Sequence, residues 1–403
     1  MTSTAALVYG SALDAYDLGP LHPFKTERFT LAVELLADYG VLGDDIALLE
    51  PQAATDEQLA RVHTSEYLAL LRLASARPDA WTVPQAGIGT GDDPIFEGAY
   101  GAAALVCGAT TAALRTVLDG EYRRSMSIAG GLHHAHADRA SGFCFLNDIG
   151  VAIADALARD PELRVAYVDI DAHHGDGVQD LFYAEPRVLT VSLHESGTFL
   201  FPGTGFTDET GDGPGVGTSA NLPLPPKAAD DCYRLAFAEF VGPVVTGFRP
   251  DVIVAQLGAD ALHADPLTSL GLTLPGYAHL VDSIVALADR LCEGKVAATG
   301  GGGYDAYSRV PRAWAWATAR LGDVTLPSAL PETWRDRVGS LGAASIPRTL
   351  LEDHYRADPT ESAMLLRLTD NAIRTAREDF EASAAADGGG RRRGSGPAMR
   401  PRS

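Results

Sequence analysis

Residues 165–177, VAYVDIDAHHGDG, decide the fold of this chain. The apolar run 165–168 is typical of a strand buried on both faces of a parallel sheet. Five acidic or histidine side chains follow it within eight residues. If the strand continues to His173, the side chains of Asp169, Asp171 and His173 point the same way, because successive side chains alternate. Two carboxylates and an imidazole would then meet at the carboxyl end of a strand, where open α/β sheets place their ligands.

This density of charge predicts a metal site. Burying charged groups beside an apolar strand is costly unless they bind an ion or pair with one another. Gly175 and Gly177 allow the chain to turn sharply directly after the strand. A plain polar turn is the simpler alternative, and the number of charges argues against it.

Composition restricts the class of protein. The chain has 403 residues, 46% hydrophobic and 21% charged, enough for a sizeable core in one large domain or two ordinary ones. The net charge of −21 argues against a nucleic-acid enzyme. Four widely spaced cysteines without a CxxC pair indicate a reduced, cytosolic chain. With no signal-peptide pattern at the N-terminus and no run of 18 apolar residues, we expect a cytoplasmic protein without a membrane segment.

Strand and helix patterns alternate along most of the chain, which predicts a parallel sheet of right-handed βαβ units. We expect strands at 5–9, 125–129, 165–168, 188–193, 251–257 and 296–299. Helices are expected at 26–39, 55–73, 96–118, 230–248 and 275–292, and from Asn147 or Asp148 to about 158. The segments 79–94 and 196–226 are predicted loops. We assign residues 1–380 to one domain, with a core at about 5–320 and a helical or irregular extension, and expect the Arg-rich residues 381–403 to be disordered.

Unusual residues follow four of the predicted strands. They are His133 and His134, the segment 169–176, Asp260, and Tyr304. Because the ends of parallel strands meet at one edge of a sheet, these residues can form a single site. A catalytic zinc needs three protein ligands and an open position for water, and Asp171, His173 and Asp260 supply that set. Two carboxylates and one imidazole also suit ferrous iron or cobalt.

The remaining residues of this group suit proton transfer. A bound metal lowers the pKa of its water and polarises a carbonyl, and a general base must then move the proton. The pair His133–His134 suits that role, with Asp169 and Asp176 as the carboxylates that orient the rings. Tyr304, after four glycines, is placed to donate its hydroxyl to a developing oxyanion.

Each motif also has a simpler explanation. A His-His pair after Gly-Gly can be an ordinary turn, and Asp260 can cap one. The glycines 300–303 are followed by no Lys-Ser or Lys-Thr, so a phosphate-binding P-loop is not expected. Cys144 could serve a Cys-His hydrolase, but between two phenylalanines it is expected to be a buried structural cysteine. His136 is expected to lie in an exposed loop.

Eight motifs occur in a fixed order: HPFK (22–25), GLHHA (131–135), SGFC (141–144), DIDAHHGDG (169–177), VSLH (191–194), FPGTG (201–205), QLGAD (256–260) and GGGY (301–304). Together they resemble the zinc-dependent histone deacetylase family, and its bacterial acetoin-utilisation deacetylase branch in particular. The resemblance covers about residues 5–320.

The resemblance implies an arginase/deacetylase-like α/β fold with an eight-stranded parallel sheet between helices. It implies hydrolysis of N-ε-acetyl-lysine to lysine and acetate, on acetylated cytosolic metabolic enzymes such as an acetyl-CoA synthetase. His134, backed by Asp176, would be general base and acid. His133, backed by Asp169, would stabilise the transition state, and Tyr304 would polarise the acetyl carbonyl.

The resemblance also implies three sets of binding residues. Zinc would be held by Asp171, His173 and Asp260. The substrate would be bound by Asp92, Gly142, Phe143, Phe201, Leu267 and Gly302. A structural potassium ion would be held by Asp169, Asp171, His173, Ser192 and Leu193, with backbone carbonyls contributing. Leu132 stands where an aromatic residue often precedes the histidine pair, so we expect more room beside the acyl-lysine tunnel.

Three other functions fit parts of the pattern. An acetylpolyamine amidohydrolase would benefit from the acidic body, which steers cations. An arginase-like enzyme would hold two manganese ions, but only one complete three-ligand set is present in the sequence. A non-catalytic acyl-lysine-binding module would keep the pocket without turnover. The oligomeric state does not follow from the sequence.

Overall fold

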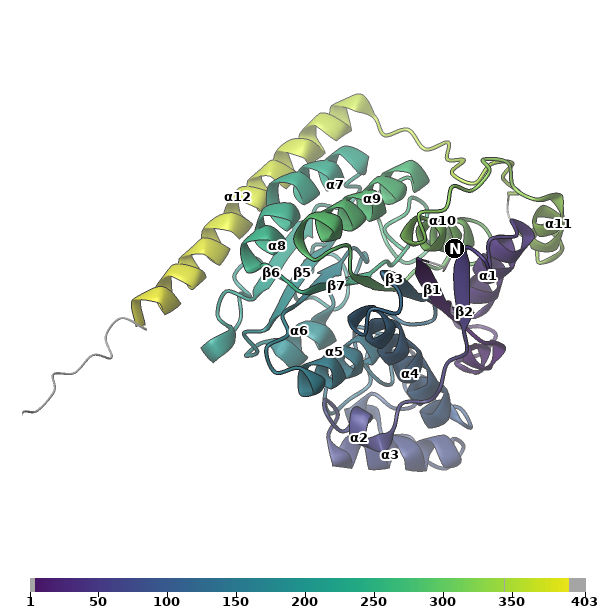
Figure 1. Cartoon of the computed structure of the whole chain (residues 1–403), viewed down its shortest axis with the longest axis horizontal. Helices are drawn as coiled ribbons and strands as arrows, with labels where there is room; N and C mark the ends of the chain where they lie inside the picture. Colours follow the sequence, from purple (N-terminus) through teal and green to yellow (C-terminus); the bar gives the residue numbers. More distant parts are fainter. Residues whose placement is uncertain (1–3, 344, 391–403) are drawn as a thin grey trace, which may run out of the picture.

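A computed structural model describes residues 4–343 and 345–390, with the backbone alone for residues 384–390. Its centre is an eight-stranded sheet, parallel throughout, with the strand order β2-β1-β3-β8-β7-β4-β5-β6 (Figure 1). The strands are β1 Ala5–Val8, β2 Ile46–Leu49, β3 Arg124–Ser127, β4 Val165–Asp169, β5 Val188–Glu195, β6 Ser219–Leu224, β7 Val252–Gln256 and β8 Val296–Thr299. The predicted central parallel sheet of eight strands is confirmed.

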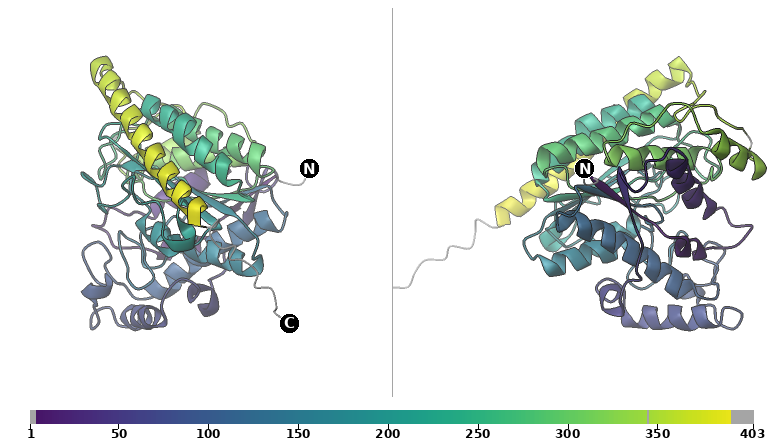
Figure 2. Two further views of the ribbon diagram at one scale, coloured as in Figure 1. Left: turned by 90° about the vertical axis from the view of Figure 1, so that its left-hand side faces the viewer. Right: turned by 45° about the vertical axis from the view of Figure 1, so that its right-hand side comes forward.

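Helices cover both faces of this sheet (Figures 1 and 2). They are α1 Glu27–Asp38, α2 Asp56–Leu59, α3 Ser65–Ala76, α4 Ala99–Leu118, α5 Asp148–Arg159, α6 Asp176–Phe182, α7 Asp230–Ala236, α8 Gly242–Phe248, α9 Leu274–Leu291, α10 Arg309–Leu321, α11 Glu332–Ser340 and α12 Pro359–Gly390. Helices α4, α5 and α6 lie on one face, and α7, α8 and α9 lie on the other. The long helix α12 runs along the outside of α7 and α8 and packs beside the edge strand β6.

The side chains of β4 show why the sheet lies in the middle. Val165 and Tyr167 join a hydrophobic cluster formed with residues of α4 and α5. Ala166 and Val168 point the other way into the larger core. Since successive side chains alternate, an apolar strand of this kind is stable only with helices on both sides.

Helix α4 is, among the described residues, the one helix long and apolar enough to cross a membrane by length and composition. Its sequence contains no run of 18 consecutive apolar residues, in agreement with the sequence analysis, and it meets the criterion through its mean hydropathy. In the structure 72% of its apolar stretch is buried. It packs against α5 and β3, which is the setting of a core helix in a folded domain.

The sheet register brings the strand ends to one level. Ser127 of β3 pairs with Thr299 of β8, which pairs with Gln256 of β7. Gln256 pairs in turn with Asp169 of β4, and Asp169 with Ser192 of β5. The loops after β3, β8, β7 and β4 therefore start side by side. These are the four strands after which the sequence predicted functional residues.

Several predicted boundaries are wrong. Strand β4 ends at Asp169 and does not continue to His173, so the next residues form a bend instead of alternating. The predicted loop 196–226 contains β6, and β2 was not predicted at all. Strand β6 was missed because its buried residues include polar ones and because Pro223, tolerated at a sheet edge, suggested a loop. The tail expected to be disordered from 381 continues α12 to Gly390, and the rest of it lies outside the described residues.

The central strands should dominate stability. Ile253 on β7 is fully buried, and removing most of such a side chain leaves a cavity. We expect Ile253→Ala to lower the free energy of unfolding by about 2–5 kcal/mol. The control Met364→Ala removes a side chain on α12 that is 53% exposed and should change it by less than about 0.5 kcal/mol. Urea unfolding checks both, and equal effects would contradict the proposed core.

Candidate active site

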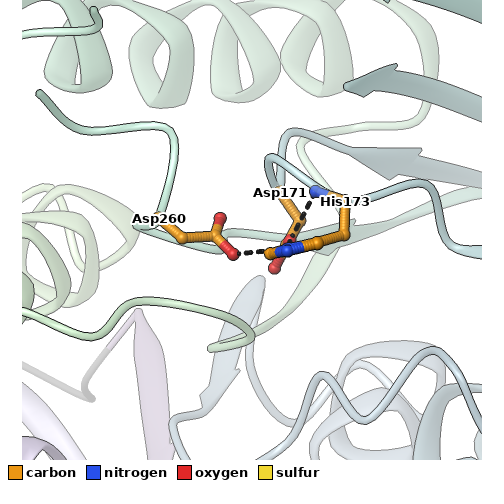
Figure 3. A group of neighbouring side chains, drawn as sticks. All are labelled: Asp171, His173 and Asp260. Atoms are coloured by element: carbon orange, nitrogen blue, oxygen red, sulfur yellow. Dashed lines mark hydrogen bonds and ion pairs between the residues drawn. The ribbon is translucent and has the colours of Figure 1, made fainter. Parts of the chain in front are cut away.

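Three predicted metal ligands meet beyond the carboxyl ends of β4 and β7. Ligand atoms of Asp171, His173 and Asp260 all lie within 4.8 Å of one another, and all three side chains are buried (Figure 3). Nδ1 of His173 lies 3.1 Å from Oδ1 of Asp171 and 2.9 Å from Oδ2 of Asp260. Among the residues that the structure describes, this is the one group of histidine, cysteine and acidic side chains with such spacing.

Backbone groups fix the two carboxylates of this group. Oδ2 of Asp171 accepts hydrogen bonds from the Gly302 N–H at 2.7 Å and from Nε2 of Gln256 at 2.8 Å. Oδ1 of Asp260 accepts one from the Ala172 N–H at 2.8 Å. A Cβ on Gly302 would lie 2.0 Å from Oδ2 of Asp260, so only glycine permits this close approach. Gly302, predicted to bind substrate, thus lies against both carboxylate ligands.

The two carboxylates of this group favour a positive charge beside them, which a protonated His173 or a bound cation can supply. Burial raises the pKa of Asp260 to about 6, and the neighbouring Asp171 adds to that effect. Burial works against a charged His173, but its hydrogen bonds to both carboxylates raise its pKa well above the usual range. Two buried carboxylates facing one imidazole nitrogen therefore require a positive charge between them. The donor set suits a divalent metal with an open coordination position.

Two histidines beside this group are each oriented by their own aspartate. Nδ1 of His133 lies 2.9 Å from Oδ2 of Asp169, and Nδ1 of His134 lies 2.7 Å from Oδ1 of Asp176. Because each carboxylate accepts the Nδ1–H of its ring, both Nε2 atoms face the site. These Nε2 atoms are 3.1 Å apart, a distance that requires one proton between them.

The environment gives the two rings opposite protonation states. Burial lowers the pKa of His134 to about 4, helped by the positive charge of His133. Burial acts in the same direction on His133, but the charges of Asp169 and Asp171 outweigh it and raise the pKa of His133 to about 9. Near neutral pH His133 is the cation that donates, and His134 is the neutral ring that accepts. Such a divergence assigns acid and base roles.

One carboxylate holds two of the predicted substrate-contacting residues. Oδ2 of Asp265 accepts the Tyr304 N–H at 2.7 Å, and Oδ1 accepts the Leu267 N–H at 2.9 Å. Asp265 is buried, and burial raises its pKa to about 8. Asp265 was not predicted, because an aspartate followed by a proline in a loop does not indicate which groups its carboxylate will bind.

Aromatic rings form the walls above the metal group. The ring of Phe201 lies 5.0 Å from that of His134, and the ring of Phe143 lies 5.8 Å from that of Tyr304. Gly142 has φ +54°, and a Cβ there would lie 2.5 Å from the His134 ring. Its carbonyl, predicted to accept a substrate N–H, lies 3.1 Å from Sγ of Cys144. A narrow cavity of about 20 Å³ is lined by Gly142, Phe143, His134, Tyr304 and Leu132 among others, and Phe201 is not one of its lining residues.

The predicted rim and potassium residues lie near this centre. Asp92 is exposed, and its carbonyl accepts a hydrogen bond at 3.2 Å from Nε2 of His22, whose ring packs against Phe143. Ser192 pairs in register with Asp169, and its Oγ lies 2.8 Å from Nδ1 of His194. The predicted potassium ligands therefore lie around the end of β4 and β5, and the ion itself stays a prediction.

The histidine loop is held by residues that the sequence did not reveal. The Asn147 side chain donates to the carbonyls of His133 and Ala135. The carboxylate of Asp148 accepts the N–H groups of Gly131 and Leu132. The sequence predicted only that a helix starts at Asn147 or Asp148, and Asn147 caps α5 by accepting the Gly150 N–H. The capping pattern gave no sign of this second role.

Two further expectations have opposite outcomes. Cys144 is buried, as predicted, and burial raises the pKa of its thiol well above the usual range; this argues against a nucleophilic role. His136 was expected in an exposed loop, and this is wrong. Its side chain is 6% exposed and contacts the second oxygen of Asp176.

A buried group of candidate metal ligands beside a pair of aspartate-bound histidines is typical of the active site of a metal-dependent hydrolase. Comparison with protein families agrees: residues 22–321 match the histone deacetylase domain. The chain belongs to the histone deacetylase family.

Relatives within the family are similar over most of their length. The acetoin utilization protein AcuC of Bacillus subtilis is 40% identical over 331 residues, which cover 82% of this chain and 85% of that protein. AcuC of Staphylococcus aureus strain MSSA476 is 35% identical over 369 residues, covering 86% and 93%. The crystal structure of a histone deacetylase homologue from Aquifex aeolicus superposes with a TM-score of 0.81 at 27% identity, covering 91% of this chain and all of that one. A homologue complexed with SAHA gives 0.79 at 28% identity, covering 91% and 99%.

Loss of one ligand should abolish metal binding. We expect the wild-type protein to bind about one zinc ion per chain and Asp260→Ala to retain only background levels, because two ligands do not complete the set. Equilibrium dialysis followed by elemental analysis measures this. The control Asp282→Asn changes a half-exposed carboxylate paired with Arg320 and should bind as wild type. Full zinc content in Asp260→Ala would place the metal elsewhere.

Proposed function

We propose that this protein is a metal-dependent lysine deacetylase that hydrolyses N-ε-acetyl-lysine to lysine and acetate. Membership of the histone deacetylase family and similarity to AcuC proteins support the reaction class. The observation that carries the proposal is the pair His133–His134, whose rings are held by separate aspartates beside the candidate metal ligands.

The metal would be held by the carboxylates of Asp171 and Asp260 and by the imidazole of His173, and zinc suits that donor set best. A bound divalent metal supplies Lewis acidity, which lowers the pKa of water and polarises a carbonyl oxygen.

His134 acts as the general base and then as the general acid. Its Nε2 is unprotonated near neutral pH, because burial and the charge of His133 lower its pKa to about 4. When substrate and water bind, the N–H of His133 turns from this nitrogen to the acetyl oxygen. The attacking water then gives its proton to the free Nε2 of His134 as the new C–O bond forms. The same proton then goes to the lysine nitrogen as the C–N bond breaks, which leaves the lysine amine and acetic acid. The acid then gives its proton to the amine, so the final products are acetate and the lysine ammonium.

His133 and Tyr304 stabilise the charge that develops on the acetyl oxygen. The imidazolium of His133 supplies a fixed positive charge in a site with little water. The Tyr304 hydroxyl donates a hydrogen bond, and its backbone is held by Asp265. Burial raises the pKa of this hydroxyl well above the usual range, so it keeps its proton and remains a donor.

The substrate lysine would enter between Phe143 and Phe201. Aromatic walls suit the four methylenes of a lysine side chain, and the carbonyl of Gly142 would accept the amide N–H. At the rim, Asp92 would bind the substrate backbone, with Leu267 beside it. We extend the proposal to acetylated cytosolic enzymes such as an acetyl-CoA synthetase as substrates, and to a structural potassium ion at Asp169 and its neighbours.

A second candidate is hydrolysis of acetylated polyamines. The net charge of −21 favours it, because a strongly acidic body attracts cationic substrates. Parallel turnover measurements with an acetyl-lysine peptide and N-acetylspermidine separate the two. A higher kcat/KM for the peptide supports the first proposal, and a reversed preference would support the second. Ligand binding without any turnover of either would support a binding module.

The central prediction concerns Tyr304. The zinc-loaded protein should hydrolyse a fluorogenic acetyl-lysine peptide, chelation should stop the reaction and added zinc should restore it. Tyr304→Phe should lower kcat by about 10²–10³-fold, because one oxyanion donor is removed.

The matched control is Tyr307→Phe, which removes a hydroxyl from a half-buried tyrosine three residues further on. It should retain wild-type kcat. Full activity of Tyr304→Phe would contradict the role given to this hydroxyl, and activity unaffected by chelator would contradict metal dependence.

A further inference from the structure

A second histidine contacts the aspartate that orients the general base. Oδ1 of Asp176 accepts from Nδ1 of His134 at 2.7 Å, while Oδ2 lies 3.3 Å from Nε2 of His136. The other ring nitrogen of His136 lies 2.9 Å from Oδ2 of Asp180. The hydrogen bonds thus form one line, Asp180–His136–Asp176–His134, which starts at the surface and ends in the active site.

The ring of His136 carries a positive charge in this setting. Burial works against the charged form, but hydrogen bonds to Asp176 and Asp180 outweigh it and raise the pKa of His136 to about 9. Both ring nitrogens therefore carry protons near neutral pH and donate to the two carboxylates. His134 and His136 together hold the pKa of Asp176 well below its usual range, although burial acts to raise it.

The other charged and titratable groups around His136 do not change this assignment. On its own loop, Arg139 acts to lower the pKa of His136, but it is half-exposed and paired with Asp138. From the segment before α3, Nδ1 of His63 lies 3.0 Å from the His136 carbonyl. Burial lowers the pKa of His63 to about 4, so this ring is neutral and adds no charge.

We propose that His136 is a positioning residue for the deacetylase reaction, which holds Asp176 against His134 and offsets the negative charge of that carboxylate. The inference rests on the proposed function, because it concerns the same general base. With Oδ2 bound to His136, the Asp176 carboxylate has one orientation, and Oδ1 points at His134. With both of its oxygens bound, the Asp176 carboxylate holds the Nδ1–H of His134 and so fixes the tautomer of that ring.

The direction of the effect follows from the charges. Removing the positive charge of His136 leaves the full negative charge of Asp176 acting on His134. This raises the pKa of His134, so the base stays protonated up to a higher pH. The acid limb of the pH profile of kcat/KM should therefore move upward, while KM should not change because His136 does not face the substrate tunnel.

The test uses the full-length, zinc-loaded protein with the fluorogenic acetyl-lysine peptide from pH 5.5 to 9.5. His136→Gln keeps a side-chain N–H for Asp176 but has no charge. We expect its acid limb to move upward by about one pH unit, which is about a tenfold loss of kcat/KM on that limb, with kcat at the plateau within about threefold of wild type. His136→Ala should lose plateau kcat as well, at unchanged KM.

Two surface variants keep the test independent of any folding defect. Asp180→Asn removes the outer partner of His136, a side chain that is 63% exposed. Because it removes a negative charge and leaves the contact between His136 and Asp176, it should not move the acid limb upward. The matched control Asp138→Asn changes the net charge equally on the histidine loop and should shift nothing. A wild-type profile for His136→Gln, a change confined to KM, or an upward shift in Asp180→Asn as large as that in His136→Gln would overturn the proposal.

Failure of the proposed function can be distinguished from failure of this inference. NMR titration of the protein with labelled histidine imidazoles follows His136 directly, without turnover. A cationic His136 at pH 7 supports the charge assignment even if the peptide is not a substrate. A neutral His136 at pH 7 would overturn it even if the wild-type enzyme is fully active.

Discussion

The structure depends on keeping five carboxylates buried at one edge of a sheet. Asp169, Asp171, Asp176, Asp260 and Asp265 are each at most 9% exposed. Buried negative charge is tolerated only where it is paired, hydrogen-bonded or bound to a cation. Each of the five carboxylates has partners of this kind. Imidazole rings face Asp169 and Asp176, backbone N–H groups bind Asp265, and the remaining two carboxylates converge on His173, where the proposed metal would complete the balance.

The sheet makes this concentration of charge possible. Four neighbouring strands end at one level, so their loops deliver side chains from distant parts of the chain to one place. Glycines allow the loops to approach closely, most clearly at Gly131, where a Cβ would lie 2.6 Å from the backbone of Gly301. The buried guanidinium of Arg28 adds a positive charge beneath the site, and donates to the Gly303 carbonyl at 2.7 Å. Rigid strands and permissive loops together fix the distances that proton transfer requires.

Much of this arrangement could be predicted from the sequence. The parallel-sheet rule brings the ends of β3, β4, β7 and β8 together, and it identified Asp171, His173 and Asp260 without any coordinates. Asp171 and His173 do not continue the alternation of a strand, as was predicted, because β4 ends at Asp169. A bend after the strand places both ligands instead. The three predicted ligands do lie together, although the strand geometry predicted for Asp171 and His173 is wrong. Side-chain convergence depends on where strands end, and less on how far their alternation continues.

What the sequence could not give was the set of supporting contacts. His136, Asp265 and Gln256 carry no distinctive spacing, because their partners are decided by loop conformation and not by periodicity. Strand β6 was hidden for a related reason: its buried polar residues, Ser219 and Asn221, are satisfied by the side chain of Gln179, 40 residues away in sequence or more. Hydrophobic periodicity in the sequence predicts helices and strands one segment at a time. It cannot predict a hydrogen-bond network between side chains that are distant in sequence.

The most direct test of the account is anomalous diffraction from crystals grown with zinc, recorded on both sides of the zinc absorption edge. The account predicts one strong peak among the carboxylates of Asp171 and Asp260 and Nδ1 of His173, at about 2.0–2.2 Å from each ligand atom. Two adjacent peaks would indicate a binuclear centre of the arginase type. No peak at this position, in protein that hydrolyses acetyl-lysine, would contradict the claim that a metal at these three residues balances the buried charge and supports the reaction.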